Sequence, residues 1–304
     1  MEYKKLLKNR NTRLKLLRLF DWVPDKMMLK LQYYIKMGRR LNLDNPKRFS
    51  EKLQWYKLYY KDDTMAICAD KYDVRGFVRE RGYENILIDC LGVYDSVDSL
   101  QFESFPNEFV LKDTLGSGGD SVIIVNKKLG FNEIAIKQKC QEWLDNGLVK
   151  VDPGREWVYC QQKHRIIVEK KLEKDRSCND LLDYKFFCFN GKCRFIYVIG
   201  ERTLGNGAGL AVLTNDFEKL DVLRTDERKL NMNIVKPENY EEMLRIAESL
   251  SMGFPEVRVD LYNTNGKIYF GEMTFYDGSG YMKYDPDEFD FTAGEFFILP
   301  SKRE

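Results

Sequence analysis

The sequence has almost no histidine, and its cysteines are not clustered. His164 is the only histidine in 304 residues, and the seven cysteines between Cys68 and Cys193 form no Cys-x-x-Cys pair. This excludes a typical zinc site and argues against a disulfide framework, so we expect a reducing cytoplasm. No Ser-His or Cys-His pair is evident, and we do not expect nucleophilic catalysis by such a pair.

Long apolar runs and a strong overall charge are also missing. No stretch approaches the roughly 20 apolar residues that span a bilayer, and lysines and arginines interrupt the N-terminus, unlike a signal peptide. The net charge is only +1, so we expect no nucleic-acid partner. The charge is unevenly spread, however: residues 1–40 hold 12 Lys/Arg and three acidic residues, a net +9, and the remaining 37 basic and 45 acidic residues give −8.

The basic residues 1–40 also carry apolar side chains at helical spacing. We expect helices whose apolar residues, such as Leu6, Leu14, Leu17 and Met28, pack on the rest of the protein while the charges are solvated and play an accessory electrostatic role. The alternative is peripheral contact of residues 1–40 with the anionic inner face of a membrane, where each basic residue contributes ~1 kcal/mol.

Hydrophobic spacing predicts helices first and a mixture of strands and helices later. Helices are expected at 4–20, 25–40, 50–60, 64–82, 132–146 and 235–250. Strands are expected at 109–112, 121–125 and 165–170, and in two hairpins, one turning at Asn190-Gly191 and one at 263–266. Because no regular βαβ order appears, the class is α+β.

A glycine loop lies between the first two predicted strands. Lys112 ends one strand, and Gly116, Ser117, Gly118 and Gly119 follow before the next. Glycines let backbone N–H groups turn toward an anion, and the serine adds a hydroxyl donor. The loop matches neither a Walker motif nor GxGxxG, and a plain hairpin loop is the alternative.

The second hairpin carries charged residues inside apolar strands. Arg258 and Asp260 share one face of the first strand, as do Glu272 and Thr274 of the second. If the two faces coincide, two carboxylates and a hydroxyl converge, and such hard oxygen ligands suit Mg²⁺ bound to nucleotide phosphates. The alternative is a solvated acidic hairpin with an Arg–Asp salt bridge.

Two further candidates are weaker when each is considered alone. Glu169 lies where an apolar strand runs into Lys170 and Lys171, and a strand end of this kind can bind an adenine edge, with the carboxylate accepting from the amino group. Lys71 lies in a predicted helix. The alternatives are a surface strand end and a solvated lysine.

Taken together and in order, seven segments resemble the ATP-grasp superfamily, and within it the TupA-like branch of teichuronopeptide and polysaccharide clusters. They are NPKRFSEKLQWYKL, ADKYDVRGFV, FPNEFVLKDTLGSGG, RIIVEKKL, DYKFFCFNGK, FPEVRVDLYN and KIYFGEMTFYDGSG. The resemblance covers about residues 20–300 and implies two α+β lobes that enclose ATP, at 63–164 and 165–304, after an N-terminal helical region at 1–62.

The resemblance also implies roles for individual residues. Phosphate contacts are implied for Lys71, Lys112, Gly116, Ser117, Gly118, Gly119 and Lys185. Adenine contacts are implied for Glu169, Lys170 and Leu172. Mg²⁺ ligands are implied for Asp260, Glu272 and Thr274. Catalytic roles in stabilising the acyl-phosphate step are implied for Arg258, Lys112 and Lys185. Thr274 departs from the family, where most members have asparagine.

The activity that the resemblance implies is ATP- and Mg²⁺-dependent joining of a carboxylate to an amine through an acyl phosphate. The expected substrates are a uronic acid or amino acid carboxylate and an amine, in surface polysaccharide synthesis. Two alternatives stay open. One is a sugar kinase of the same fold, and the other is a nucleotide-binding scaffold with little turnover, which only the threonine at position 274 favours.

Overall fold

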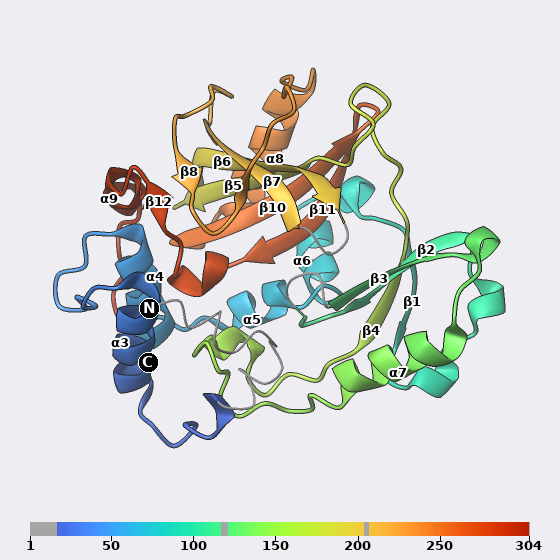
Figure 1. Cartoon of the computed structure of the whole chain (residues 1–304), viewed down its shortest axis with the longest axis horizontal. Helices are drawn as coiled ribbons and strands as arrows, with labels where there is room; N and C mark the ends of the chain where they lie inside the picture. Colours follow the sequence, from blue (N-terminus) through green and yellow to red (C-terminus); the bar gives the residue numbers. More distant parts are fainter. Residues whose placement is uncertain (1–16, 117–120, 204–206, 304) are drawn as a thin grey trace.

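The computed structural model describes residues 17–116, 121–203 and 207–303, and it contains two main sheets with helices around them (Figure 1). The α-helices described are α3 (Asp25–Met37), α4 (Phe49–Tyr59), α5 (Asp63–Ala69), α6 (Val74–Glu80), α7 (Glu133–Leu144), α8 (Tyr240–Ser251) and α9 (Glu288–Phe296). Within these ranges, no helix is both long and apolar enough to cross a membrane.

The strands form a four-stranded sheet, a six-stranded sheet and a small pair. They are β1 (Cys90–Tyr94), β2 (Glu108–Asp113), β3 (Val122–Asn126), β4 (Ile166–Lys170), β5 (Asp183–Phe189), β6 (Lys192–Thr203), β7 (Gly207–Thr214), β8 (Leu223–Arg224), β9 (Arg228–Lys229), β10 (Glu256–Thr264), β11 (Lys267–Thr274) and β12 (Tyr284–Asp285). A short 3₁₀ turn, η7 (Asp277–Gly280), follows β11.

Most predicted elements are confirmed, but the single helix expected at 64–82 is wrong. The chain there forms α5 and α6 with a break between them. Asp70 causes the break, because its side chain accepts from the backbone N–H groups of Tyr72 (2.8 Å) and Asp73 (2.9 Å). The N–H of Lys71 meanwhile bonds to the carbonyl of Thr114 (2.9 Å), so the break is fixed to the end of β2.

Another predicted helix differs from the structure in extent. α8 begins at Tyr240 rather than at residue 235, since Pro237 precedes it and Asn239 is its N-cap residue. The helix expected at 4–20 lies mostly outside the described residues. Met28 and Leu29 of α3 are buried, as expected. The outward face of this helix was expected to be polar, but it also carries exposed apolar side chains.

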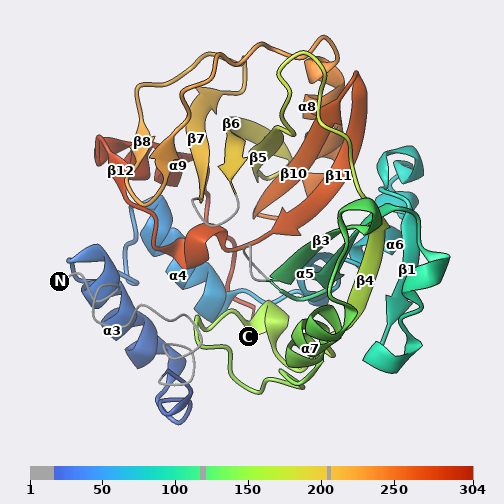
Figure 2. The same cartoon turned by 45° about the vertical axis from the view of Figure 1, so that its right-hand side comes forward.

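The four-stranded sheet has the order β1-β4-β2-β3 and is antiparallel throughout. Phe109 and Leu111 of β2 belong to the same hydrophobic cluster as Trp143 of α7, so α7 covers one face of this sheet (Figure 2). Because side chains alternate along a strand, Lys112 of β2 points to the opposite face. Glu169 of β4 does the same, since its neighbour Val168 belongs to the α7 cluster.

The six-stranded sheet has the order β11-β10-β5-β6-β7-β9. Its two predicted hairpins are confirmed, and their turns, Asn190-Gly191 and Asn265-Gly266, have positive φ at both residues, as two-residue hairpin turns require. On one face, Tyr240 of α8 stacks on Phe186 of β5, with ring centroids 6.0 Å apart.

The other face of the six-stranded sheet carries both packed aromatic rings and charged groups. Phe49 of α4 packs edge-on against Phe187 of β5 (6.2 Å) and Phe195 of β6 (6.4 Å). Asp183 and Lys185 share this face, because they are four and two residues, respectively, from Phe187 along β5. The charged groups therefore extend the same face on which α4 is packed.

Helix α4 is also bonded to the turn that follows β11. Lys57 donates to the carbonyls of Gly154 and Ser279, both at 2.9 Å. Gln54 donates to the carbonyls of Ser279 (2.9 Å) and Gly280 (3.0 Å). Figures 1 and 2 show this turn, η7, beside α4. The N-terminal region is thereby tied to the end of the second hairpin.

Phe49→Ala should lower the free energy of unfolding by about 3–5 kcal/mol, because it removes a ring that is fully buried between α4 and the six-stranded sheet. Ile134→Ala, at an exposed position of α7, should change it by about 0.5 kcal/mol or less. Urea unfolding of both variants measures the difference. A loss below about 1 kcal/mol for Phe49→Ala would contradict a shared core for α4 and the sheet.

Candidate active site

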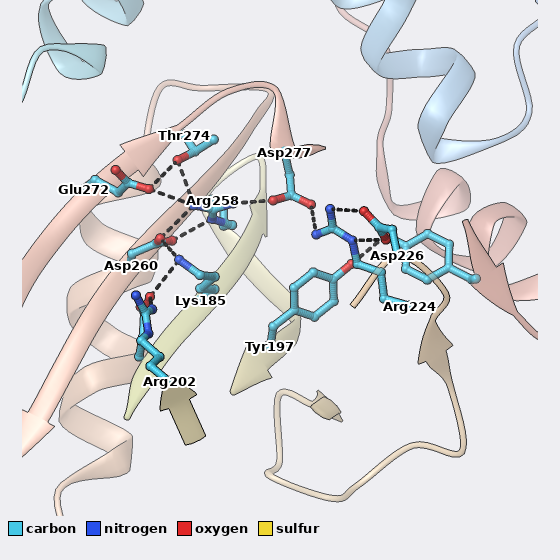
Figure 3. A network of polar contacts seen from close by, with 12 residues as sticks. Lys185, Tyr197, Arg202, Arg224, Asp226, Arg258, Asp260, Glu272, Thr274 and Asp277 are labelled. Carbon is cyan, nitrogen blue, oxygen red and sulfur yellow. Dashed lines mark hydrogen bonds and ion pairs between the residues drawn. The ribbon is translucent and has the colours of Figure 1, made fainter. Parts of the chain in front are cut away.

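Arg258 of β10 is at the centre of a buried polar network (Figure 3). Its Nε donates to Asp260 Oδ1 (2.7 Å), and its Nη2 donates to Glu272 Oε1 (3.0 Å) and Thr274 Oγ1 (3.0 Å). The hairpin register explains this, because Arg258 pairs with Thr274 and Asp260 pairs with Glu272. The two strand faces coincide, as the convergence of these four side chains requires, and a β-bulge between Asp260 and Leu261 sets this register. The Arg–Asp salt bridge is present as well, but it is buried and not solvated.

Lys185 extends the network onto β5. Its Nζ lies 2.9 Å from Asp183 Oδ2 and also donates to Asp260. Burial and the nearby Arg258 lower the pKa of Lys185, but Asp183, Asp260 and Glu272 outweigh them, so its pKa is raised above the ordinary value. Lys185 is therefore a half-buried, charged lysine that contacts two carboxylates.

A second group of charged side chains comes from the four-stranded sheet and the adjacent α6. Lys112 Nζ lies 2.6 Å from Glu169 Oε2, and Arg75 Nη1 of α6 lies 3.4 Å from Glu169 Oε1. Lys71, in the break between α5 and α6, donates to the carbonyl of Gly116 at the start of the glycine loop. The predicted phosphate lysines, Lys71 and Lys112, thus lie at the same side of this sheet.

Glu272 is where the two groups meet electrostatically. Burial would raise the pKa of its carboxyl, but four cations outweigh burial and lower it from 4.5 to about 2. The cations are Lys71, Lys185, Arg258 and Lys112. The Glu272 side chain is still 38% exposed. Positive groups from both sheets therefore surround one carboxylate that solvent can reach, and such an arrangement suits a polyanionic ligand.

Burial affects the two other carboxylates of the hairpin region in different ways. It raises the pKa of Asp260 to about 6, although Arg258 and Lys185 act in the opposite direction. It would also raise the pKa of Asp277, but Arg224 and Arg258 outweigh it and the net shift is downward. Asp277 contacts both arginines, at 3.0 Å from Arg224 Nη1, so it anchors Arg258 from the side opposite Asp260.

The sequence reasoning missed several members of the network. Asp183 could have been found, because it lies two residues before Lys185 on the same strand face. Arg75 lies in α6, and no local pattern connects it with Glu169, which is 94 residues later in the chain. Asp277, Arg224 and Arg202 come from turns and strand ends whose mutual positions no local pattern predicts. Arg202 reaches Asp183 from β6.

Some predicted site residues are not brought to this network. The Lys170 side chain is 64% exposed, lies 3.6 Å from Asp89, and points away from the face of Glu169. Leu172 follows the end of β4 and is partly exposed. Ser117, Gly118 and Gly119 lie outside the described residues. Gly116 is described, and a Cβ there would lie 2.3 Å from the Ser121 Cβ, so this position requires glycine.

A protein-family model, TupA-like ATPgrasp, matches residues 51–298. The chain belongs to this family. The match confirms the resemblance seen in the sequence motifs and the ATP-grasp fold expected from it. It includes nearly all of α4 and ends after α9, and it leaves out α3. No curated protein matches the chain.

Solved structures similar to this TupA-like ATPgrasp protein include ligases. D-alanine–D-alanine ligase from Bacillus anthracis is 18% identical, with a TM-score of 0.39, and the match covers 69% of this chain and 57% of the ligase. The L-amino acid ligase from Bacillus licheniformis is 14% identical (TM-score 0.41; 70% and 42%). A RimK domain ATP-grasp protein from Sphaerobacter thermophilus is 12% identical, with a TM-score of 0.42, and the match covers 90% of this chain and 95% of that protein. The chain thus spans little more than half of the first ligase.

Lowering the pH should reduce the stability of the wild type more than that of the Glu272→Gln variant. The folded pKa of Glu272, about 2, lies below its ordinary 4.5. Its contribution is therefore present above pH ~4.5 and is lost as the pH falls toward 2. Solvent screening of the half-exposed group keeps the effect modest.

Urea unfolding at a series of pH values measures this difference, with Glu242→Gln on the exposed side of α8 as the matched control. The wild type should lose stability relative to Glu272→Gln below pH ~4.5, and Glu242→Gln should follow the wild type. Parallel curves for the wild type and Glu272→Gln would show that the cations do not act on this carboxylate.

Proposed function

We propose that the protein is an ATP- and Mg²⁺-dependent ligase that joins a carboxylate to an amine. One observation carries the proposal: cations from both sides of the site lower the pKa of Glu272. Lys71 and Lys112 lie beside the four-stranded sheet, and Lys185 and Arg258 belong to the six-stranded sheet. Membership of the TupA-like ATPgrasp family supports a nucleotide as the polyanion. In this proposal the two lobes predicted at 63–164 and 165–304 enclose ATP after the helical region 1–62, with β4 assigned to the first lobe because it pairs with β1 and β2.

The phosphate groups would lie among the lysines of both lobes. Lys71 and Lys112 would bind them from the first lobe, together with the loop that starts at Gly116. Lys185 and Arg258 would bind them from the second lobe. Each of these cations now contacts a carboxylate or a carbonyl oxygen, and phosphate oxygens are acceptors of the same kind with more charge. Glu169 and Leu172 remain proposed adenine contacts.

The hairpin carboxylates fit a magnesium ion carried by the nucleotide. Arg258 Nη2 donates to both Asp260 Oδ2 (2.7 Å) and Glu272 Oε1 (3.0 Å), so both carboxylates contact the same guanidinium nitrogen. Mg²⁺ in nucleotide sites is held by one or two carboxylates, with substrate phosphates completing the shell. Thr274, 3.0 Å from the same nitrogen, would be a third and weaker oxygen ligand. The ion would neutralise and orient the phosphates.

The proposed chemistry has two steps. An oxygen of the substrate carboxylate attacks the γ-phosphorus, the bond to ADP breaks, and an acyl phosphate forms. The amine then attacks the carbonyl carbon, phosphate leaves, and the amine proton passes to solvent. Lys112, Lys185 and Arg258 would hold the phosphoryl group in line and offset its charge, so catalysis rests on positioning and electrostatics.

The proposed substrates are a uronic acid or amino acid carboxylate and an amine, in surface polysaccharide synthesis such as that of a capsule. The support is the TupA-like character of the sequence, which resembles polysaccharide-cluster members. Product analysis by mass spectrometry, with a panel of hexuronates, amino acids and amines, tests the reaction type. Amide, ADP and phosphate support the ligase. A sugar phosphate would indicate the kinase, and the absence of ADP release would indicate the scaffold.

Lys112→Ala should reduce turnover by about 10²–10³-fold, because a cation aimed at the transferred phosphoryl group is lost. It should also weaken binding of a non-hydrolysable ATP analogue. Because Lys112 contacts the buried Glu169, some stability is lost too, which the Arg75–Glu169 contact limits.

The matched control is Lys192→Ala, which breaks an exposed Lys–Glu pair of similar length, 2.9 Å to Glu248. It should leave turnover and nucleotide affinity at wild-type values. Titration calorimetry measures the affinity. A Lys112→Ala variant that binds the analogue as tightly as the wild type would overturn the phosphate role of this lysine.

A further inference from the structure

Helix α3 carries large apolar side chains on both its buried and its outward face. One face is buried in the protein by Leu29, Tyr33 and Met37, among others. The outward face carries four large apolar or aromatic side chains that are 42–62% exposed: Met27, Leu31, Tyr34 and Ile35. Their i, i+4, i+7, i+8 spacing places them on one stripe of the helix. A surface helix is normally polar on the side that faces solvent.

The exposed apolar surface continues into the segment that precedes the helix. Leu19, Phe20 and Trp22 are exposed, Trp22 by 81%. Residues 19–35 thus hold seven of the 19 exposed large hydrophobic side chains in the described part of the chain. Such concentration within 17 residues marks an interaction surface, because single exposed apolar residues are normally scattered. We call these seven residues the α3 apolar face: Leu19, Phe20, Trp22, Met27, Leu31, Tyr34 and Ile35.

Positive charge accompanies this face. Lys30 lies three residues after Met27 and four before Tyr34, within the stripe itself, and Lys26 is exposed beside it. Arg18 and Arg40 are exposed at the two ends of the segment. Asp25 is the only acidic residue of α3, and it faces Arg155 at 3.5 Å. Residues 1–16 add six basic residues and one acidic residue to the chain immediately before the segment.

A hollow of about 470 Å³ adjoins the helix and combines the same two properties. Gly38 ends α3 with a φ of 75° and turns the chain back. The hollow is lined by Lys30, Leu31, Tyr34, Arg40 and Leu41. Two cationic side chains beside apolar walls suit a ligand with a phosphate group and an acyl chain.

We propose that the α3 apolar face lies on an anionic phospholipid membrane, with α3 parallel to the surface. Apolar side chains would enter the acyl boundary while the lysines and arginines meet lipid phosphates. Trp22 and Tyr34 are exposed on this face. They suit the boundary between lipid headgroups and acyl chains, because tryptophan and tyrosine are enriched at membrane interfaces. α3 lies on the opposite side of the molecule from β1 and the four-stranded sheet (Figures 1 and 2), so that sheet would face away from the lipid.

Vesicle co-sedimentation of the full chain tests this proposal, with phosphatidylcholine alone and with phosphatidylcholine mixed with phosphatidylglycerol. The wild type should pellet with the mixed vesicles at low salt, less at high salt, and not with phosphatidylcholine alone. Leu31→Ser/Ile35→Ser should lower the binding constant for the mixed vesicles by about tenfold or more, because two apolar side chains are lost. Ile134→Ser, at a more exposed apolar position on α7, should pellet like the wild type.

Trp22 offers a second readout. Its fluorescence should shift to shorter wavelength when mixed vesicles are added, and Trp22→Phe should abolish that shift. Thermal unfolding and ADP release by the Leu31→Ser/Ile35→Ser variant should match the wild type, so failure of membrane binding and failure of the proposed ligase activity are distinguishable.

Three results would overturn the proposal. The wild type could remain in the supernatant with mixed vesicles. Deletion of residues 1–16 could remove all binding while Leu31→Ser/Ile35→Ser retains it, which would assign the contact to charge in that segment. Light scattering could show a dimer that the double variant dissociates, with no lipid binding, which would make the α3 apolar face a contact between two copies of the chain.

Discussion

The buried guanidinium of Arg258 is the interaction on which the rest of the site depends. It contacts side chains of three elements: Asp260 of its own strand, Glu272 and Thr274 of β11, and Asp277 of η7. A buried carboxylate without a partner costs several kcal/mol. Arg258 is the one cation that contacts both Asp260 and Asp277, and Lys185 and Arg224 each contact one of them. The same contacts hold the two hairpin carboxylates that would bind the proposed metal ion, so Arg258 links the packing of the sheet to the chemistry of the site.

The N-terminal helices have two different relationships to this site. α4 belongs to its support, because Gln54 and Lys57 bond to the η7 turn that carries Asp277. Burial lowers the pKa of Lys57, although Glu156 lies nearby, and its three acceptors on Gly154 and Ser279 satisfy the ammonium group. α3 is different. It lies before the range that the TupA-like ATPgrasp model matches, and its outward side offers apolar surface to a partner.

The sequence was most informative where a local rule decides the structure. Strand alternation was enough to place Arg258 with Asp260 and Glu272 with Thr274. The two pairs share one face only because a β-bulge between Asp260 and Leu261 shifts the register that the turn sets, and the sequence did not predict this bulge. The contact of Lys112 with Glu169 was not predictable, because it depends on the register of β2 against β4, more than 50 residues away. The break at Asp70 was missed because side-chain bonds to backbone N–H groups override helical spacing. Spacing also could not show which side of α3 is covered.

The central claim is that the cations around Glu272 form a site for nucleotide phosphates. A crystal structure of the protein with Mg²⁺ and a non-hydrolysable ATP analogue tests it most directly. The account predicts that the β- and γ-phosphates contact Lys112 and Lys185, with the metal ion between the phosphates and the carboxylates of Asp260 and Glu272. A triphosphate bound elsewhere, with Glu272 contacting neither metal nor phosphate-bound cations, would contradict it.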